Sequence, residues 1–179
     1  MAEIDYPIFA IRRAVRPAVR APRRWWGAVG WTKERDVAST FPQYSQGTCP
    51  ICERLVKFVA WSAHYRDEFL CESCLNYSIP RERALAAVLK RLYPNWRDLS
   101  IHESSPVDRG LSAQMKRQCG DYVATQYYPG IALGEMHKGF RNENLEQSTF
   151  PDARFDLVVT QDVMEHVNDF PKALSDINL

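Results

Sequence analysis

The chain of 179 residues has no run of about 18 apolar residues, so no segment of it is predicted to span a membrane. It also lacks an apolar signal segment at its start, and it has no repeat or low-complexity tract. Cysteine is scarce, with five residues, and without a signal segment these thiols are expected to stay reduced in a cytoplasmic setting. The hydrophobic content of 45% indicates a globular chain of one domain or two small ones.

The net charge of +1 is small but unevenly distributed. Residues 1–48 hold eight Lys and Arg against four Asp and Glu, and six of the arginines fall within residues 12–24, where acids are absent. Tryptophans follow at Trp25, Trp26 and Trp31. Such a cluster could bind a nucleic acid or an anionic surface. The simpler interpretation is an irregular arm, because Pro- and Arg-rich sequence with weak periodicity does not indicate regular structure.

The cysteines that are present form two CxxC pairs, Cys49–Cys52 and Cys71–Cys74, separated by 18 residues. Two such pairs can supply the four thiolates of a closed, tetrahedral structural zinc site. The alternatives are disulfides, which require an oxidising compartment, and a redox motif, which would lie within a βαβ unit. The sequence favours zinc in a small ribbon or treble-clef module. Cys119 is expected to be a reduced thiol outside the site.

Four regions follow from these patterns. Residues 1–48 are the basic arm, residues 49–80 the zinc module, residues 81–95 a linking helix, and residues 96–179 an α/β domain. The linking helix is predicted from Pro80 to about Tyr93, since Pro suits a first helical turn and another Pro follows at 94. Its apolar face is expected to comprise Ala84, Leu85, Val88, Leu89 and Leu92.

Strand and helix patterns alternate after Trp96. Strands are predicted over Arg97–Glu103, Asp121–Gln126 and Phe155–Thr160, with a short one near Gly139–Glu143. Helices are predicted over Asp108–Gln118 and from Phe170 onward. This order predicts an α/β fold with a partial, doubly wound parallel sheet of about four strands. Its ligands should bind at the carboxyl ends of the strands.

The most specific motif is FPDARFDLVVTQDVMEHVNDFPKAL, from Phe150 to Leu174. It resembles the class I, Rossmann-like S-adenosylmethionine-dependent methyltransferases, in which an FPD-x-x-FDLV strand leads into a D-x-x-EHV loop and a helix. The upstream segments YVATQYYPG and GFRNENLEQSTFPD are similar to one subgroup, which has an acidic residue, serines and a proline in place of glycines. The resemblance covers about Leu99 to Leu179. It implies a core cut short at its C-terminus, because the complete family sheet has seven strands.

The resemblance also implies a cofactor site. Glu103 would lie beneath the methionine part of S-adenosylmethionine. Gln126 takes the place of the acid that holds the ribose hydroxyls, and Asn144 stands in the adenine-contacting pair, where aspartate is more usual. The complete set of implied cofactor contacts is Glu103, Ser104, Ser105, Gln126, Tyr127, Asn144, Leu145, Gln161 and Asp162.

In methyl transfer to an already activated donor, the protein mainly aligns the methyl group with its acceptor and excludes water. His166 is the candidate general base, since its free pKa of about 6.5 lies near neutrality. The methyl acceptor stays unidentified. Three interpretations remain open: an active methyltransferase with structural zinc, a zinc-dependent RNA- or protein-binding module on a degenerate and inactive fragment, and a fragment without independent activity.

The missing strands predict one more property. Residues Leu157 to Val159 would form an apolar strand at an unpaired sheet edge, and such an edge invites self-association. If the chain proves monomeric, the arm of residues 1–48 is the first candidate to cover that edge.

Overall fold

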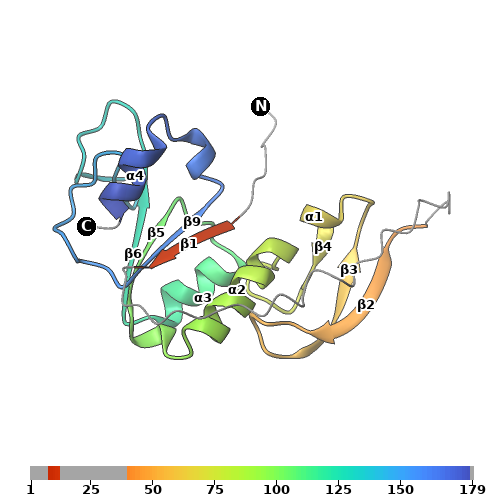
Figure 1. Ribbon diagram of the computed structural model, residues 1–179. Coiled ribbons are helices and arrows are strands. Elements are labelled where there is room, and N and C mark those ends of the chain that lie inside the picture. Colours follow the sequence, from red (N-terminus) through yellow and green to blue (C-terminus); the bar gives the residue numbers. More distant parts are fainter. Residues whose placement is uncertain (1–7, 13–39, 178–179) are drawn as a thin grey trace.

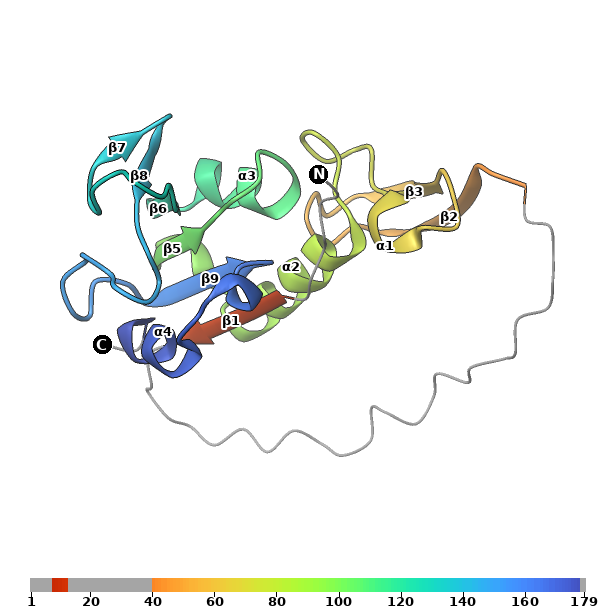
Figure 2. The ribbon, with the colours of Figure 1, turned by 90° about the horizontal axis from the view of Figure 1, so that it is seen from above.

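The computed structural model describes residues 8–12 and 40–177. These residues form a six-stranded sheet and a three-stranded sheet, with helices α2 (Pro80–Leu92) and α3 (Gly110–Gln118) between them (Figures 1 and 2). Within the described residues, no helix is both long and apolar enough to cross a membrane.

The small sheet contains the two cysteine pairs at its turns. Its strands β2 (Gln43–Thr48), β3 (Leu55–Ala60) and β4 (Phe69–Leu70) are antiparallel, and α1 (Tyr65–Glu68) lies between the last two. The first cysteine pair occupies the turn from β2 to β3, and the second follows β4 directly. The sheet of the module therefore starts at Gln43, inside the region predicted to be an irregular arm.

Helix α2 begins at the predicted proline, and its first turn is fixed because the Glu82 carboxylate accepts a hydrogen bond from the Ile79 N–H at 3.1 Å. The predicted apolar face is wrong in part, since Ala84 is exposed and Val88 and Leu92 are 49% and 58% exposed. The helix is rotated because its first turn is buried by polar contacts rather than by apolar ones. The residues that it buries are Glu82, Arg83, Leu85, Ala86 and Leu89.

One continuous hydrophobic core joins the cysteine module to the large sheet. It runs from the cysteines of the module through α2 and α3 to the central strands of the large sheet. Its members include Cys49, Phe58, Cys71, Leu85, Leu89, Trp96, Ile101, Leu111, Met115, Leu157 and Val159. The two sheets therefore share their packing through the helical layer between them.

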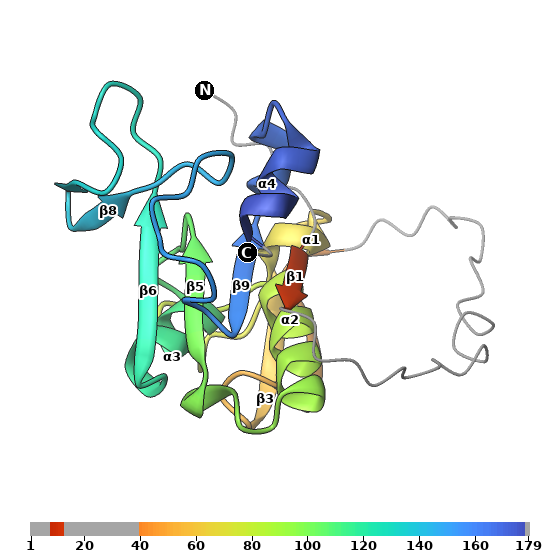
Figure 3. The same ribbon diagram turned by 60° about the vertical axis from the view of Figure 1, so that its left-hand side comes forward.

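The large sheet confirms the predicted doubly wound α/β fold. Its parallel strands are β5 (Ser100–Ser104), β6 (Asp121–Gln126), β8 (Phe140–Asn142) and β9 (Leu157–Gln161). They lie in the order β9-β5-β6-β8 (Figure 3), so the winding reverses between β5 and β9. This reversal is the switch point where doubly wound sheets bind ligands.

The remaining elements complete this domain. Short strand β7 (Met136–His137) pairs antiparallel with β8, and α4 (Phe170–Ile177) closes the described chain. Two 3₁₀ turns span Trp96–Asp98 and Met164–His166. The first of these turns delays the start of β5 to Ser100, three residues after the predicted start.

The predicted free edge of the large sheet is corrected by the structure. Strand β1 (Ile8–Arg12) pairs antiparallel with β9 in the register Ile8–Gln161 to Arg12–Leu157 (Figure 3). A segment of the N-terminal region thus covers this edge, and the basis for self-association through β9 is removed. Apart from Arg12, the last residue of β1, the predicted Arg and Trp cluster lies outside the described residues.

Candidate metal centre and cofactor cavity

The four cysteine sulfurs of the module converge on one point. The Sγ atoms of Cys49, Cys52, Cys71 and Cys74 all lie within 4.8 Å of one another. Cys49 and Cys74 are 3.6 Å apart, and Cys52 and Cys71 are 3.9 Å apart. A tetrahedral zinc with Zn–S bonds of about 2.3 Å separates its sulfurs by about 3.8 Å. The cluster therefore fits zinc. All five cysteines are free in the structure, which has none of the disulfides of the alternative interpretation.

The surroundings shift the thiols of the cluster in opposite directions: burial raises the pKa of Cys71, and the hydrogen bond with Cys49, together with burial, raises the pKa of Cys74. The hydrogen bond with Cys74 lowers the pKa of the Cys49 thiol, and Ser78 Oγ donates to Cys74 Sγ at 3.3 Å. The Arg83 guanidinium is buried nearby and donates to the carbonyls of Ser78 and Phe69 at 2.6 and 2.7 Å. Burial lowers the pKa of Arg83, and the cysteine thiolates oppose that effect. This buried cation would offset part of the negative charge of four thiolates around a metal ion.

A cavity of about 260 Å³ lies at the carboxyl ends of the parallel strands. Its walls come from the ends of β5 and β6 and from the residues directly after β8 and β9, so it straddles the switch point of the sheet. Of the sequence-predicted site residues, the structure brings eight to its walls: Ser104, Ser105, Gln126, Tyr127, Asn144, Leu145, Asp162 and His166.

Two features of the cavity wall indicate a ligand. The Ser104 hydroxyl is buried and has no hydrogen-bond partner among the described residues. Buried polar atoms are almost always paired, so this hydroxyl is available to a bound molecule. Ser105 and Asp162 both adopt positive φ angles, of 52° and 54°, at the turns after β5 and β9. Such strained non-glycine residues concentrate at binding sites.

Two sequence-predicted contacts do not line the cavity. The Glu103 carboxylate is buried on the α3 side of the sheet, where it accepts hydrogen bonds from Ser112 Oγ at 2.6 Å and Tyr122 OH at 2.7 Å. The Gln161 amide turns toward the same carboxylate and donates to it at 3.2 Å. Burial raises the pKa of Glu103 to about 7, although these three hydrogen bonds lower it. Glu103 therefore holds the end of β5, which carries Ser104, by contacts on the α3 side of the sheet.

His166 lies at the mouth of the cavity, exposed, on the 3₁₀ turn of residues 164–166. Its backbone N–H donates to the Val163 carbonyl at 2.9 Å.

The sequence did not reveal three residues that shape the cavity. Asn142 is fully buried and holds the loop after β6: its amide donates to Ile131 O at 2.8 Å and its oxygen accepts from Tyr128 N at 2.7 Å. Glu143 lines the cavity and pairs with Arg141 at 2.6 Å. Arg81, at the start of α2, pairs with Asp162 at 3.3 Å. The contacts of Asn142 and Arg81 join segments distant in sequence, for which no local motif exists, whereas Glu143 pairs with a neighbour two residues away.

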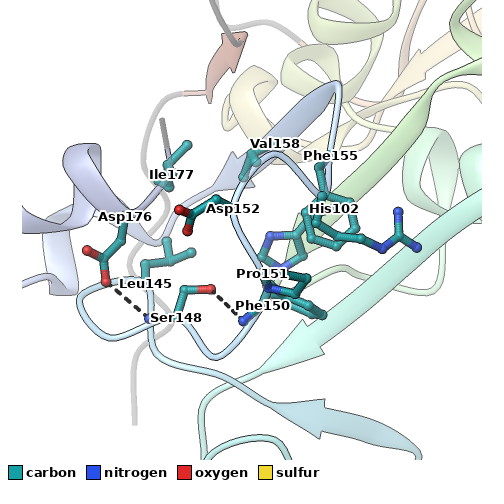
Figure 4. Close-up of a pocket in the computed structure, with 11 residues that line it drawn as sticks. His102, Leu145, Ser148, Phe150, Pro151, Asp152, Phe155, Val158, Asp176 and Ile177 are labelled. Carbon is teal, nitrogen blue, oxygen red and sulfur yellow. Dashed lines mark hydrogen bonds between the residues drawn. The ribbon is translucent and has the colours of Figure 1, made fainter. Parts of the chain in front are cut away.

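A second cavity, of about 150 Å³, lies beside the loop of residues 148–155 and α4 (Figure 4). His102 forms one wall, stacked on Phe155 with ring centroids 5.1 Å apart and bonded to Thr125 Oγ1 at 2.8 Å. Burial lowers the pKa of His102 to about 4, so the ring is neutral at neutral pH. This cavity is away from the turns that carry Ser105 and Asp162, and it holds none of the predicted cofactor contacts except Leu145.

A family model described as a methyltransferase domain matches residues 110–178 of the chain. The match begins at α3 and contains β6, β8, β9, α4 and most of the cavity wall. It supports the resemblance to methyltransferases, and with it methyl transfer as the general activity and S-adenosylmethionine as the general methyl donor. The match does not include the cysteine module. The search of the curated proteins found no match, and neither did the search of the solved structures.

Proposed function

We propose that the chain is an S-adenosylmethionine-dependent methyltransferase that binds its methyl donor in the switch-point cavity and holds its fold with one structural zinc ion. The observation that carries this proposal is the convergence of the predicted contacts from four strand ends on one cavity, within the segment that matches a methyltransferase domain. The acceptor stays unidentified.

S-adenosylmethionine supplies an activated methyl group, so the residues of the chain need mainly to bind, orient and exclude water. Gln126 and Asn144 offer amide groups to hydroxyl and base edges, and Tyr127 offers a ring beside them. The Ser104 hydroxyl would gain its missing partner on ligand binding. His166 would accept a proton from an acceptor that must lose one before attack.

The cavity also predicts that binding is modest. Its volume of about 260 Å³ is just below the roughly 300–1,000 Å³ of small-molecule sites. An amide at the ribose position also lacks the strength of a charge-assisted hydrogen bond. We therefore expect S-adenosylmethionine to bind more weakly than it would with an acidic residue at the ribose position.

The zinc ion would be structural. Four protein sulfurs leave no open coordination position, and three of the cysteines are buried in the core that continues to the large sheet. Metal binding and folding of the module are then a single equilibrium.

The test is calorimetric titration of the zinc-loaded chain with S-adenosylhomocysteine, the demethylated product. Tyr127→Ala should weaken binding severalfold, because it removes a ring from the cavity wall. Tyr44→Ala is the matched control, since Tyr44 is equally exposed, at 54%, but lies on β2 in the module. Absence of binding by the folded wild-type chain, or equal weakening by both variants, would count against the proposal.

A further inference from the structure

Arg81 lies between the cysteine module and the cofactor cavity and contacts both sides. Its Nη1 pairs with the Asp67 carboxylate at 2.8 Å, and its Nε pairs with Asp162 at 3.3 Å. The Arg81 side chain is 13% exposed and that of Asp162 is 20% exposed, so solvent screens this second pair only partly. Asp67 belongs to α1 of the module, whereas Asp162 lines the cavity.

On the module side, the position of Arg81 follows from the second cysteine pair. Cys71 and Ser78 exchange two backbone hydrogen bonds, of 3.0 and 3.1 Å, and Ser78 Oγ bonds to Cys74 Sγ. Helix α2 starts two residues later, at Pro80. A metal that fixes Cys71 and Cys74 therefore also fixes the first turn of α2, which carries Arg81.

On the cavity side, Arg81 contacts the turn after β9. Asp162 follows β9 directly and has a φ of 54°, a left-handed conformation that Asp tolerates better than most residues and that the pairing with Arg81 helps to hold. Within the described residues, the Arg81–Asp162 pair is the ion pair that joins the α2 first turn to a residue of the cavity wall.

We propose that Arg81 is a positioning residue that couples the metal site to the cofactor cavity. Metal binding orders the Cys71–Cys74 turn and the start of α2, and Arg81 then holds Asp162 in the conformation that the cofactor requires. The inference rests on the proposed function, because it assumes a cofactor in this cavity. Coupling between two binding sites is reciprocal, so the cofactor must raise metal affinity by the same factor.

Other contacts across this boundary do not reach the cavity. Arg109 pairs with the buried Glu82 at 2.7 Å, and the Gly110 N–H bonds to the Leu75 and Tyr77 carbonyls at 3.2 and 3.1 Å. The first joins α2 to the start of α3 and the second joins the module to α3, and both are expected to affect stability alone.

The experiment measures the zinc dissociation constant of the full chain by competition with a chromogenic chelator, without and with saturating S-adenosylhomocysteine. The ratio of the two constants is the coupling factor. In the wild type we expect a factor of about 5 or more, the lower end of typical couplings. In Arg81→Met, which keeps the length of the side chain but not its charge, the factor should fall to about 1 while both ligands still bind. Arg66→Met, an exposed arginine of α1, should keep the wild-type factor.

The outcomes separate the two proposals. A wild type that binds no S-adenosylhomocysteine removes the proposed function and this inference together. A wild type that binds it with a factor of 1, or an Arg81→Met variant that keeps the wild-type factor, overturns the coupling alone. If Arg81→Met does not fold, Asp162→Asn decides, because asparagine tolerates the same backbone conformation without the charge. A purely structural role would lower thermal stability and leave the coupling factor unchanged.

Discussion

The metal cluster and the cofactor cavity are built in opposite ways. The cluster takes its four sulfurs from two short motifs. The chain between the motifs only has to form the antiparallel pair of β3 and β4, with α1 between them. The cavity takes its walls from four strand ends spread between Ser104 and Asn168. The first site is local and closed, and the second exists only when the parallel sheet is assembled in its order. The comparison shows why one is expected to hold the fold and the other to bind a ligand.

The largest effect should come from the metal cluster. Replacing any one of its cysteines, for example by Cys71→Ala, should release the metal and unfold the module, since structural zinc contributes about 10–16 kcal/mol in small modules. Elemental analysis together with circular dichroism measures both consequences. Cys119→Ala is the control, because Cys119 lies outside the cluster, and it should retain stoichiometric zinc. A folded, zinc-bound Cys71→Ala variant would contradict the role of the cluster.

A smaller effect should follow from the shared core. Leu89→Ala in α2 should lower the free energy of unfolding by about 2–5 kcal/mol, because Leu89 is buried between the two sheets. Val88→Ala on the same helix should change it by less than about 0.5 kcal/mol, because Val88 is half exposed.

This pair of variants also tests whether the two regions fold as one unit. Zinc release and the loss of helical dichroism should coincide in urea, for the wild type and for both variants. Two separated transitions would show that the module and the α/β domain are independent.

The next prediction concerns Glu103, which is fully buried. Its pKa is raised from 4.5 to about 7 in the folded state, so the folded chain binds more protons than the unfolded chain between these values. Stability should therefore fall as pH rises from about 4.5 to 7, by about 3 kcal/mol in all. Glu103→Gln should remove this part of the pH dependence. Glu165→Gln is the control, because Glu165 is exposed on a turn, and it should keep the pH dependence. Urea unfolding at pH 5 and pH 7.5 provides the comparison, and an unchanged slope in Glu103→Gln would contradict the assignment.

Much of the architecture could be predicted from the sequence. The parallel sheet followed from the alternation of strand and helix patterns, and the apolar run Leu157 to Val159 is a strand buried between β1 and β5. The rotation of α2 could not, because it depends on the pairing of Glu82 with Arg109, and ion pairs between distant segments leave no periodic signal. The edge strand β1 was not predicted, because the Pro and Arg residues around it indicate irregular structure.

The same reasoning explains the site. Residues at or directly after strand ends, such as Ser105, Gln126 and Asp162, line the cavity because the carboxyl ends of parallel strands meet at one edge. Glu103 and Gln161 did not, because both side chains are directed to one buried hydrogen-bond network on the α3 side. Successive side chains of a strand point to opposite faces of the sheet, so an error of one residue in the strand assignment places a side chain on the wrong face.

The smallest expected effect concerns the ribose position. Gln126→Glu should tighten S-adenosylhomocysteine binding about fivefold, because a charge-assisted hydrogen bond is stronger than an amide one by about 1 kcal/mol. Gln46→Glu, on exposed strand β2, adds the same charge far from the cavity and should leave binding unchanged. Calorimetry that finds no change in a folded Gln126→Glu variant would remove Gln126 from the ribose site.

The most direct test of the account is a crystal structure of the zinc-loaded chain with S-adenosylhomocysteine, with anomalous diffraction measured at the zinc edge. The account predicts one zinc ion among the sulfurs of Cys49, Cys52, Cys71 and Cys74, and the ligand between the Ser104–Ser105 turn and Asp162. A ligand bound elsewhere, or a metal coordinated by other residues, would contradict it.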